Sequence, residues 1–197
     1  MEKSKTIIIA LGGSIICPQA GKINIGFLRK FKSLILKFVK TKGIRFVIVA
    51  GGGKTCRLYQ KAAAKIVKLP YEDLDWLGIH ATRINAHLLR TIFRRMAYPV
   101  VLDNPKKIIK NNWRILIASG WRPGWSTDYI AVLLARRFKV KEIIDAGNIS
   151  FVYNKDCFKY KDTIPIKRLS WKKYRKLIGF RWIPGLPAPI DPIAAKL

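Results

Sequence analysis

The segment Arg-Phe-Val-Ile-Val-Ala-Gly-Gly-Gly-Lys-Thr-Cys-Arg, residues 45–57, is the part of the chain that best indicates its fold. Its first six residues are mostly apolar and rich in β-branched side chains, which is typical of a buried strand. Three glycines follow directly, and a helical pattern begins at Lys54. A glycine at such a junction lets backbone N–H groups approach an anion, and the following helix N-terminus adds partial positive charge. The segment therefore predicts a strand, a phosphate-binding turn and a helix.

Similar junctions occur elsewhere in the chain. Gly12-Gly13-Ser14 follows an apolar run, and so does Gly-Trp-Arg-Pro-Gly-Trp-Ser-Thr-Asp at residues 120–128, whereas 148–153 keeps less of the pattern. Open α/β sheets bind their ligands at the carboxyl ends of the strands, so we expect these turns to share one edge. Either glycine turn alone is equally explained as a tight β–α turn. Their joint placement favours a phosphate-rich pair of substrates.

Strands and helices alternate along most of the 197 residues, which predicts one domain. The predicted strands are 6–11, 45–50, 98–102, 115–119 and 142–146, and the predicted helices are 25–42, 54–67, 72–96 and 127–138. This order predicts an α/β fold, a three-layer αβα sandwich with a mostly parallel central sheet. After residue 150 the pattern changes to a basic hairpin (151–166), a short helix (171–178) and a proline-rich loop.

Composition limits the function classes. The net charge is +28, from 39 basic and 11 acidic residues, which predicts weak adhesion to RNA or to anionic surfaces. The even spread of lysines also fits a merely solvated surface. Three scattered cysteines favour a reducing compartment without disulfides or a zinc site. No apolar run reaches about 18 residues, so no transmembrane helix or membrane partner is predicted, and we expect a cytoplasmic protein.

Two common nucleotide motifs are absent. Gly53-Lys54-Thr55 invites comparison with a P-loop, but the glycine required at position 48 is an isoleucine. The first turn also lacks the Gly-x-Gly-x-x-Gly pattern of dinucleotide-binding folds. The phosphate-binding turns therefore indicate a different nucleotide-binding class.

Six motifs occur in a specific order. They are Leu-Gly-Gly-Ser (11–14), Gly-Gly-Gly-Lys-x-x-Arg (51–57), Asp-Trp-Leu-Gly-Ile-x-Ala-Thr-Arg-x-Asn-Ala (75–86), Ala-Tyr-Pro-Val-Val (97–101), Pro-Gly-x-Ser-Thr-Asp (123–128) and Ile-Asp-Pro-Ile-Ala-Ala-Lys (190–196). Over essentially its whole length the chain resembles the amino acid kinase superfamily, and within it the archaeal-type UMP kinases. The motifs at 75–86 and 123–128 separate UMP kinases from other kinases of that fold.

The resemblance implies ATP-dependent phosphorylation of UMP to UDP, with Mg²⁺ and without a dedicated set of metal-ligating side chains. It implies a homo-oligomer, often a hexamer in this family. Residues 1–145 would form the acceptor-nucleotide lobe, and 146–197 an incomplete ATP lobe. Family members continue for about 30 further residues on usual element lengths, so an exposed sheet edge is expected here.

The resemblance also assigns site residues by position. For ATP it implies Gly12, Gly13, Ser14, Gly53, Arg57, Tyr153 and Asp156. For UMP it implies Gly52, Asp75, Trp121, Arg122, Pro123, Gly124, Trp125, Ser126 and Thr127. As catalytic residues it implies Arg57, Asp128 and Asp191, with the two carboxylates organising basic groups and metal near the transferred phosphoryl group.

The residue types suit this chemistry. Phosphoryl transfer needs in-line positioning and neutralisation of charge, which two glycine turns and Arg57 would supply. A planar guanidinium can bind phosphate bidentately, although Arg57 is also explained as a solvated helix cation. Asp75 would accept from the acceptor ribose, or act as an ordinary acid in a first helical turn. Tyr153 is equally a core residue or a nucleotide shelf, and Trp121 and Trp125 either stack on a base or cover the sheet edge.

Two positions depart from the family pattern. Many superfamily members have a lysine where this chain has Ala10, and Phe151 replaces a family glycine at the ATP end. Lys54 and Lys196 are candidates to replace the missing cation. These departures keep one alternative open, a relative that binds nucleotides or anions with weakened or no catalysis. The net charge of +28 keeps open another, a basic RNA-binding protein on the same scaffold.

Overall fold

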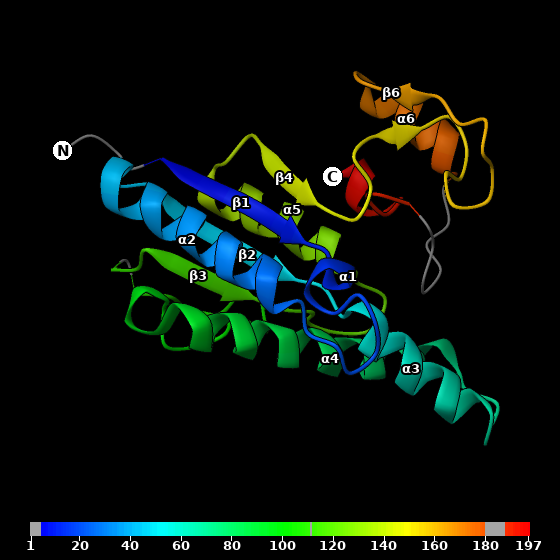
Figure 1. Ribbon diagram of the computed structural model, residues 1–197, viewed down its shortest axis with the longest axis horizontal. Coiled ribbons are helices and arrows are strands. Elements are labelled where there is room, and N and C mark those ends of the chain that lie inside the picture. Colours follow the sequence, from blue (N-terminus) through cyan, green and yellow to red (C-terminus); the bar gives the residue numbers. More distant parts are fainter. Residues whose placement is uncertain (1–4, 111, 180–187) are drawn as a thin grey trace.

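A computed structural model describes residues 5–110, 112–179 and 188–197 of the chain. The central sheet has four parallel strands in the order β3-β2-β1-β4 (Figure 1). These strands are β1 (Thr6–Leu11), β2 (Arg45–Ala50), β3 (Ile115–Ala118) and β4 (Ile143–Ala146). All three pairings are parallel, so the carboxyl ends of the strands meet at one edge, as the sequence predicts.

Helices cover both faces of the sheet (Figure 1). On one face, α2 (Ile25–Lys42) and α4 (Tyr71–Phe93) pack on the alternate strand residues that include Ile9, Ile48 and Ile117. On the other face, α5 (Thr127–Phe138) packs on the opposite alternation, which includes Val47 and Leu116. Successive side chains of a strand point to opposite faces, so two cores form on a single sheet. The predicted three-layer α/β architecture is confirmed.

Local signals set the helix ends. Asn24 Oδ1 accepts a hydrogen bond of 3.0 Å from Phe27 N at the start of α2, and Gly43 ends that helix in the left-handed region with φ 60°. Ser126 Oγ accepts from Tyr129 N at 3.0 Å and so caps α5. Two further helices, α1 (Gly13–Ile16) and α3 (Gly53–Ala64), begin at the glycine turns.

One predicted strand, Tyr98–Leu102, is wrong. The segment lies beside β3 and donates from Tyr98 N to Ile115 O at 2.7 Å and from Leu102 N to Ile117 O at 2.8 Å. Only isolated bridges form at its ends, however, next to the short helix η1 (Arg94–Met96). The four-residue step from Tyr98 to Leu102 spans only the two-residue step from Ile115 to Ile117, because the chain bends at Pro99 and Val100, and this interrupts the hydrogen-bonded ladder.

The part after β4 forms a smaller unit beside the sheet (Figure 1). It contains the predicted hairpin as the two-stranded pair β5 (Val152–Tyr153) and β6 (Pro165–Ile166), then α6 (Trp171–Ile178) and η2 (Ala194–Lys196). The Tyr174 hydroxyl donates to Ile190 O at 2.7 Å and accepts from Ile190 N at 2.8 Å, which joins α6 to the C-terminal segment. Pro184 and Pro187 of the predicted loop lie outside the described residues.

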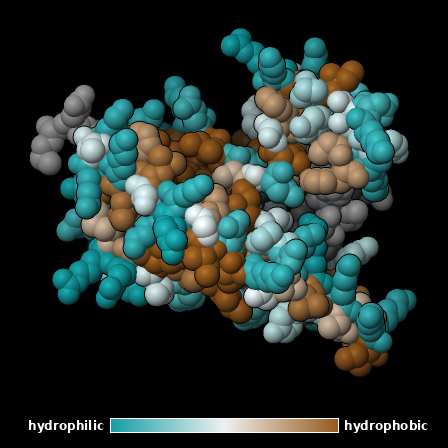
Figure 2. Space-filling view, viewed as in Figure 1, coloured by the Kyte–Doolittle hydropathy of each residue, from teal (hydrophilic) through white to brown (hydrophobic). Residues whose placement is uncertain are grey.

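Figure 2 shows hydrophilic residues around most of the outline of one face and hydrophobic residues in its middle. Among the described residues, no helix has the length and apolar character needed to cross a membrane.

Candidate active site

The first two glycine turns touch each other through their backbones. Gly12 N donates to Ala146 O at 2.9 Å and Gly51 N donates to Leu11 O at 2.9 Å, so three neighbouring strand ends are joined. A Cβ atom on Gly13 would collide with the Gly53 amide, and one on Gly53 would collide with the Gly13 carbonyl. Gly53 also has φ +69°, which a side chain rarely adopts. The two turns therefore need glycine to approach this closely.

Side chains of helix α4 hold the turns after β2 and β3 by hydrogen bonds. Asn85 Nδ2 donates to Gly51 O at 2.7 Å, and Thr82 Oγ1 accepts from Gly120 N at 2.8 Å while donating to Ile79 O at 2.6 Å. Both side chains are buried. The motif at 75–86 thus positions the turns that follow β2 and β3, a role that its helical spacing alone did not reveal.

The turns enclose two adjoining cavities. One, of about 290 Å³, is lined by residues of all three turns together with Arg57, Asp75, Trp125 and Asp191. The other, of about 610 Å³, lies toward β4 and is lined by Ala10, Lys54, Asp145 and Asp156 among others. Residues that line both cavities are Gly12, Ser14, Arg57, Thr127, Asp128 and Ala188. The cleft is therefore divided in two, with Arg57 and Asp128 at the junction.

A hydrogen bond joins the loop after β3 to the start of α4. Gly124 N donates to Asp75 Oδ2 at 2.7 Å, so this carboxylate holds the loop as well as facing the cavity. Burial raises the pKa of the Asp75 carboxyl, and the Gly124 N–H bond partly opposes that shift. Asp75 Oδ2 is thus already engaged before any ribose hydroxyl arrives.

The two tryptophans of this loop have different positions. Trp125 lines the smaller cavity, whereas Trp121, Arg122, Pro123 and Gly124 are not among its lining residues. The two indole rings meet edge to face at 4.8 Å, and the Arg122 guanidinium lies 4.5 Å from one ring centre and 4.4 Å from the other. Both rings also pack against the α5-side core. Trp125 can therefore contact a ligand in this cavity, whereas Trp121 packs on the α5-side core outside it.

Three carboxylates gather where α5 begins. Asp191 is 5% exposed, and its Oδ1 accepts from Ile193 N at 2.7 Å and Ala194 N at 2.9 Å while its Oδ2 accepts from the Ser126 hydroxyl. Asp191 N donates to Asp128 Oδ2 at 3.3 Å. Burial raises the pKa of Asp128 to about 7, and the charges of Asp145 and Asp191 add to the shift. Burial also raises the pKa of Asp145 to about 6.

This cluster predicts a pH-dependent stability. Asp128 titrates near 3.8 when unfolded and near 7 when folded, so between these values the folded chain binds more protons. Stability from this group is therefore lost as pH rises through that window, at up to about 1.4 kcal/mol per pH unit. Asp128→Asn should have nearly unchanged stability at pH 4 relative to the parent and become progressively more stable than it up to pH 7.

Urea unfolding of both proteins across this pH range measures the difference. Asp73→Asn, at an exposed position in the first turn of α4, serves as the control that removes one carboxylate outside the cluster. A constant difference for Asp128→Asn at every pH would contradict the raised pKa.

Asp156 lines the larger cavity, whereas Tyr153 lines a third hollow of about 250 Å³ next to it. Asp156 and Phe158 line both of these spaces. Cys56, Asp145 and Phe158 are among the lining residues that were not assigned to the site from sequence, and Lys54 was named there only as a candidate replacement cation. Burial raises the pKa of the Cys56 thiol, which therefore stays neutral and is a poor nucleophile. Lys54 follows the glycine turn directly, and that position was the available signal for it.

Known proteins share this arrangement. The family model described as "Amino acid kinase family" matches residues 5–197. The uridylate kinase of Staphylothermus marinus is 32% identical over 190 residues, covering 95% of this chain and 82% of that protein. The uridylate kinase of Methanococcus aeolicus is 32% identical over 194 residues, covering 97% and 84%. A crystal structure of the uridylate kinase from Archaeoglobus fulgidus has a TM-score of 0.77 and 28% identity, covering 98% of this chain and 84% of that one.

An αβα sandwich with glycine turns gathered at one sheet edge is a class of fold suited to binding phosphate-bearing ligands there. The match over residues 5–197 then places the chain in the amino acid kinase family. The resemblance to archaeal uridylate kinases is confirmed at the level of this family.

Proposed function

We propose that this protein transfers the γ-phosphoryl group of ATP to UMP. The observation that supports this most directly is the divided cleft, in which two cavities share the Gly12–Ser14 turn, Arg57 and Asp128. A transfer between two phosphates requires both nucleotides to place their phosphate ends at a common point. Relatives of similar length that carry the name uridylate kinase give the acceptor its identity.

UMP occupies the smaller cavity in this proposal. Asp75 there offers its second carboxylate oxygen to the ribose, because Oδ2 already accepts from Gly124 N. Trp125 forms the apolar wall, while Gly52, Ser126 and Thr127 offer polar groups near the phosphate. Trp121, Arg122, Pro123 and Gly124 act by shaping the loop. Residues 1–145 would make up most of this acceptor lobe.

ATP occupies the larger cavity, in the lobe formed with residues 146–197. Gly12 and Ser14 line this space and would supply N–H groups for the phosphates together with Gly13 and Gly53, which line the adjoining smaller cavity, and Lys54 lines the larger cavity with Ala10. An ammonium at this place would supply the cation that position 10 lacks. Asp156 and Tyr153 border the nucleoside, and Phe158 contributes an aromatic surface there.

Mg²⁺ enters with ATP in this proposal. Within the described part of the chain, no group of three His, Cys, Asp or Glu residues could hold a metal ion. Mg²⁺ commonly takes most of its ligands from phosphates and water, so one or two carboxylates suffice. Asp128 and Asp145 line the donor cavity, whereas both oxygens of Asp191 already accept hydrogen bonds. The ion would offset charge on the phosphates.

The remaining contributions to phosphoryl transfer would come from side chains of the protein that position the reacting groups. Arg57 lies one turn into α3 at the junction of the cavities, where its guanidinium can bind the transferred group as charge develops. Asp191 holds Ser126 and the first turn of η2, and thereby fixes the start of α5. Asp191 is thus a positioning residue rather than one that contacts the phosphates.

A coupled assay with UMP, ATP and Mg²⁺ tests the proposal, with calorimetric titration of UMP beside it. Production of UDP supports the kinase. Retained UMP binding without UDP would replace it with the second candidate, a nucleotide-binding relative without turnover, which Ala10 and Phe151 favour. Absence of both UDP formation and UMP binding would reject both candidates.

Asp75→Asn should weaken UMP binding by roughly 10- to 100-fold, since a hydrogen bond to a charged group contributes about 1.5–3 kcal/mol. ATP affinity should be nearly unchanged, because Asp75 does not line the donor cavity. The matched control is Asp73→Asn, an exposed first-turn acid of the same helix, which should leave both affinities intact. Selective loss of ATP binding would mean that the two cavities are assigned the wrong way round.

A further inference from the structure

One hollow of the described chain lies far from the glycine turns. It has a volume of about 660 Å³ and is lined by Arg90, Arg94, Arg95 and Arg114, together with neighbouring residues of the 94–99 and 112–114 segments. Arg114 directly precedes β3, so the cavity sits at the amino end of a parallel strand, opposite the edge that carries the candidate active site. It therefore belongs to neither nucleotide cavity.

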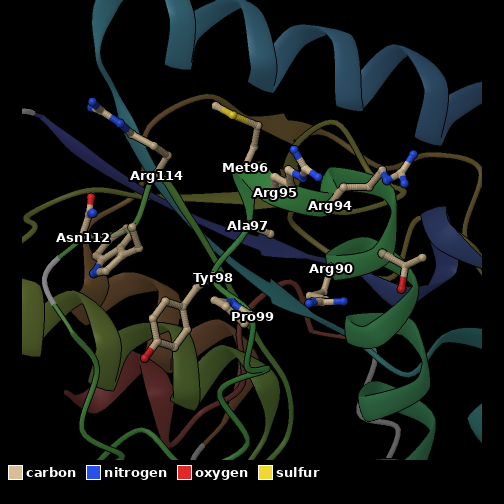
Figure 3. Close-up of a pocket in the computed structure, with 11 residues that line it drawn as sticks. Arg90, Arg94, Arg95, Met96, Ala97, Tyr98, Pro99, Asn112 and Arg114 are labelled. Atoms are coloured by element: carbon tan, nitrogen blue, oxygen red, sulfur yellow. The ribbon is translucent and has the colours of Figure 1, made fainter.

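The arginines come from two separate parts of the chain. Figure 3 shows Arg90, Arg94 and Arg95 at the end of α4 on one side and Arg114 on the other, with Tyr98 and Pro99 between them. Arg94 has φ +50°, an uncommon conformation for a residue with a side chain, at the point where α4 gives way to η1. This turn places two consecutive arginines beside Arg90.

No acid balances these charges. The described residues that line the cavity include no Asp or Glu. The ion pairs among residues 5–110, 112–179 and 188–197 use the carboxylates of Asp103, Asp156 and Asp162 and none of these arginines. Arg90 Nε is buried and has no hydrogen-bond partner in the same part of the chain. The exposed Arg94, Arg95 and Arg114 are the arginines of this cavity that an external anion can reach.

The cavity is suited to phosphate, and the Trp113 ring that lines it is not open to a base. Its largest aromatic residue, Trp113, is 5% exposed, and its ring is covered by the Arg45 guanidinium at 4.5 Å and by Phe138 at 5.3 Å. A stacked base would need an open ring face, which Trp113 does not offer. Guanidinium groups bind phosphate oxygens strongly and without regard to sequence.

The positive region continues beyond the cavity. The connection between Pro99 and Asn112, both lining residues, carries the exposed Lys106 and Lys110. A single small anion would contact only the cavity. A nucleic-acid strand, with a phosphate at every nucleotide, can contact both the cavity and the lysines of this connection. The net charge of +28 favours the same class of ligand, because each phosphate neutralised releases counterions.

We propose that the arginine cavity at the C-terminal end of α4 binds the sugar–phosphate backbone of single-stranded RNA, in a function separate from phosphoryl transfer. Binding is independent of sequence and depends steeply on salt. It does not require the nucleotide cleft and persists when that cleft is filled with UMP.

The test measures fluorescence anisotropy of a labelled RNA of mixed sequence, about 15 nucleotides long, in saturating UMP and from about 50 to 300 mM NaCl. The variant replaces Arg94, Arg95 and Arg114 with glutamine and keeps the partly buried Arg90. The control replaces the exposed Lys30, Lys37 and Lys40 of α2 with glutamine and removes the same charge. Removal of three phosphate contacts should weaken binding roughly 100-fold near 100 mM salt and lower the log–log salt slope by about 2.

The control should change the affinity only a few-fold, and both variants should keep the kinetic constants of the parent for UMP and ATP. Equal weakening in variant and control would show that RNA responds to net charge alone and would overturn the proposal. Displacement of RNA by equimolar tripolyphosphate would overturn it as well, in favour of a site for a small polyphosphate anion. Because kinase assays run in parallel, failure of either function is recognised separately.

Discussion

Replacing Arg57 with alanine should lower kcat/KM for phosphoryl transfer by about 100-fold or more, the usual loss when a charge-stabilising donor is removed from a reacting centre. Arg57 lines both cavities and lies one turn into α3. Affinity for UMP and for ATP should each fall roughly 10-fold or more, because one guanidinium serves both phosphate ends. Steady-state kinetics and calorimetric titration measure the two effects.

Folding should be nearly unaffected by this change. Arg57 is exposed, and exposed substitutions usually alter the free energy of unfolding by less than about 0.5 kcal/mol. Lys61→Ala, one turn further along α3 and also exposed, is the matched control and should keep full activity. If Arg57→Ala lost stability and ligand affinity in equal measure, its role would be structural and the assignment would fail.

Gly13→Ala should have the second large effect, abolishing measurable ATP binding and lowering stability by about 1–3 kcal/mol. The added methyl group would collide with the Gly53 amide and with Gly51 O, which are backbone atoms and cannot rotate away. The turns after β1 and β2 would separate, and the N–H groups that face the phosphates would lose their alignment. Urea unfolding and ATP calorimetry check both parts.

Gly26→Ala is the control for this prediction. Gly26 lies in the first turn of α2, and the nearest atom to an added Cβ is Asn24 Oδ1 at 3.8 Å. Alanine there should stabilise the protein by roughly 0.5–1 kcal/mol through helix propensity and leave ATP binding intact. Normal ATP affinity in Gly13→Ala would show that contact between the two turns is not needed for the phosphate site.

Much of the fold was predictable because local rules decide it. The bounds of β1, α2, β2, α5 and α6 agree with the patterns read from sequence, because hydrophobic periodicity, capping residues and terminal glycines lie within each segment. The strand expected at 98–102 failed because Tyr98, Val100 and Val101 suggest a strand while the chain bends at Pro99 and Val100, which interrupts its hydrogen bonds.

The convergence of the glycine turns was predictable, but the contacts within the site were not. Glycine turns at consecutive strand ends must meet at one edge of a parallel sheet, so the convergence of residues 12–14 and 51–53 follows from topology. The bond from Gly124 N to Asp75, the exclusion of Trp121 from the cavity that Trp125 lines, and the entry of Lys54 and Asp145 into the larger cavity depend on how distant segments approach. No pattern within one segment carries that information.

The sequence by itself determined the order of strands and helices and the glycine turns between them, because each depends on the conformational preferences of neighbouring residues. Only the tertiary structure decided that Asp128 lies near Asp145 and Asp191, and that Arg114 lines one cavity with the arginines at the end of α4. The physical reason is that pKa values and ligand cavities arise from burial and from charges brought together across the fold, and these distances are set only when the helices pack on the sheet.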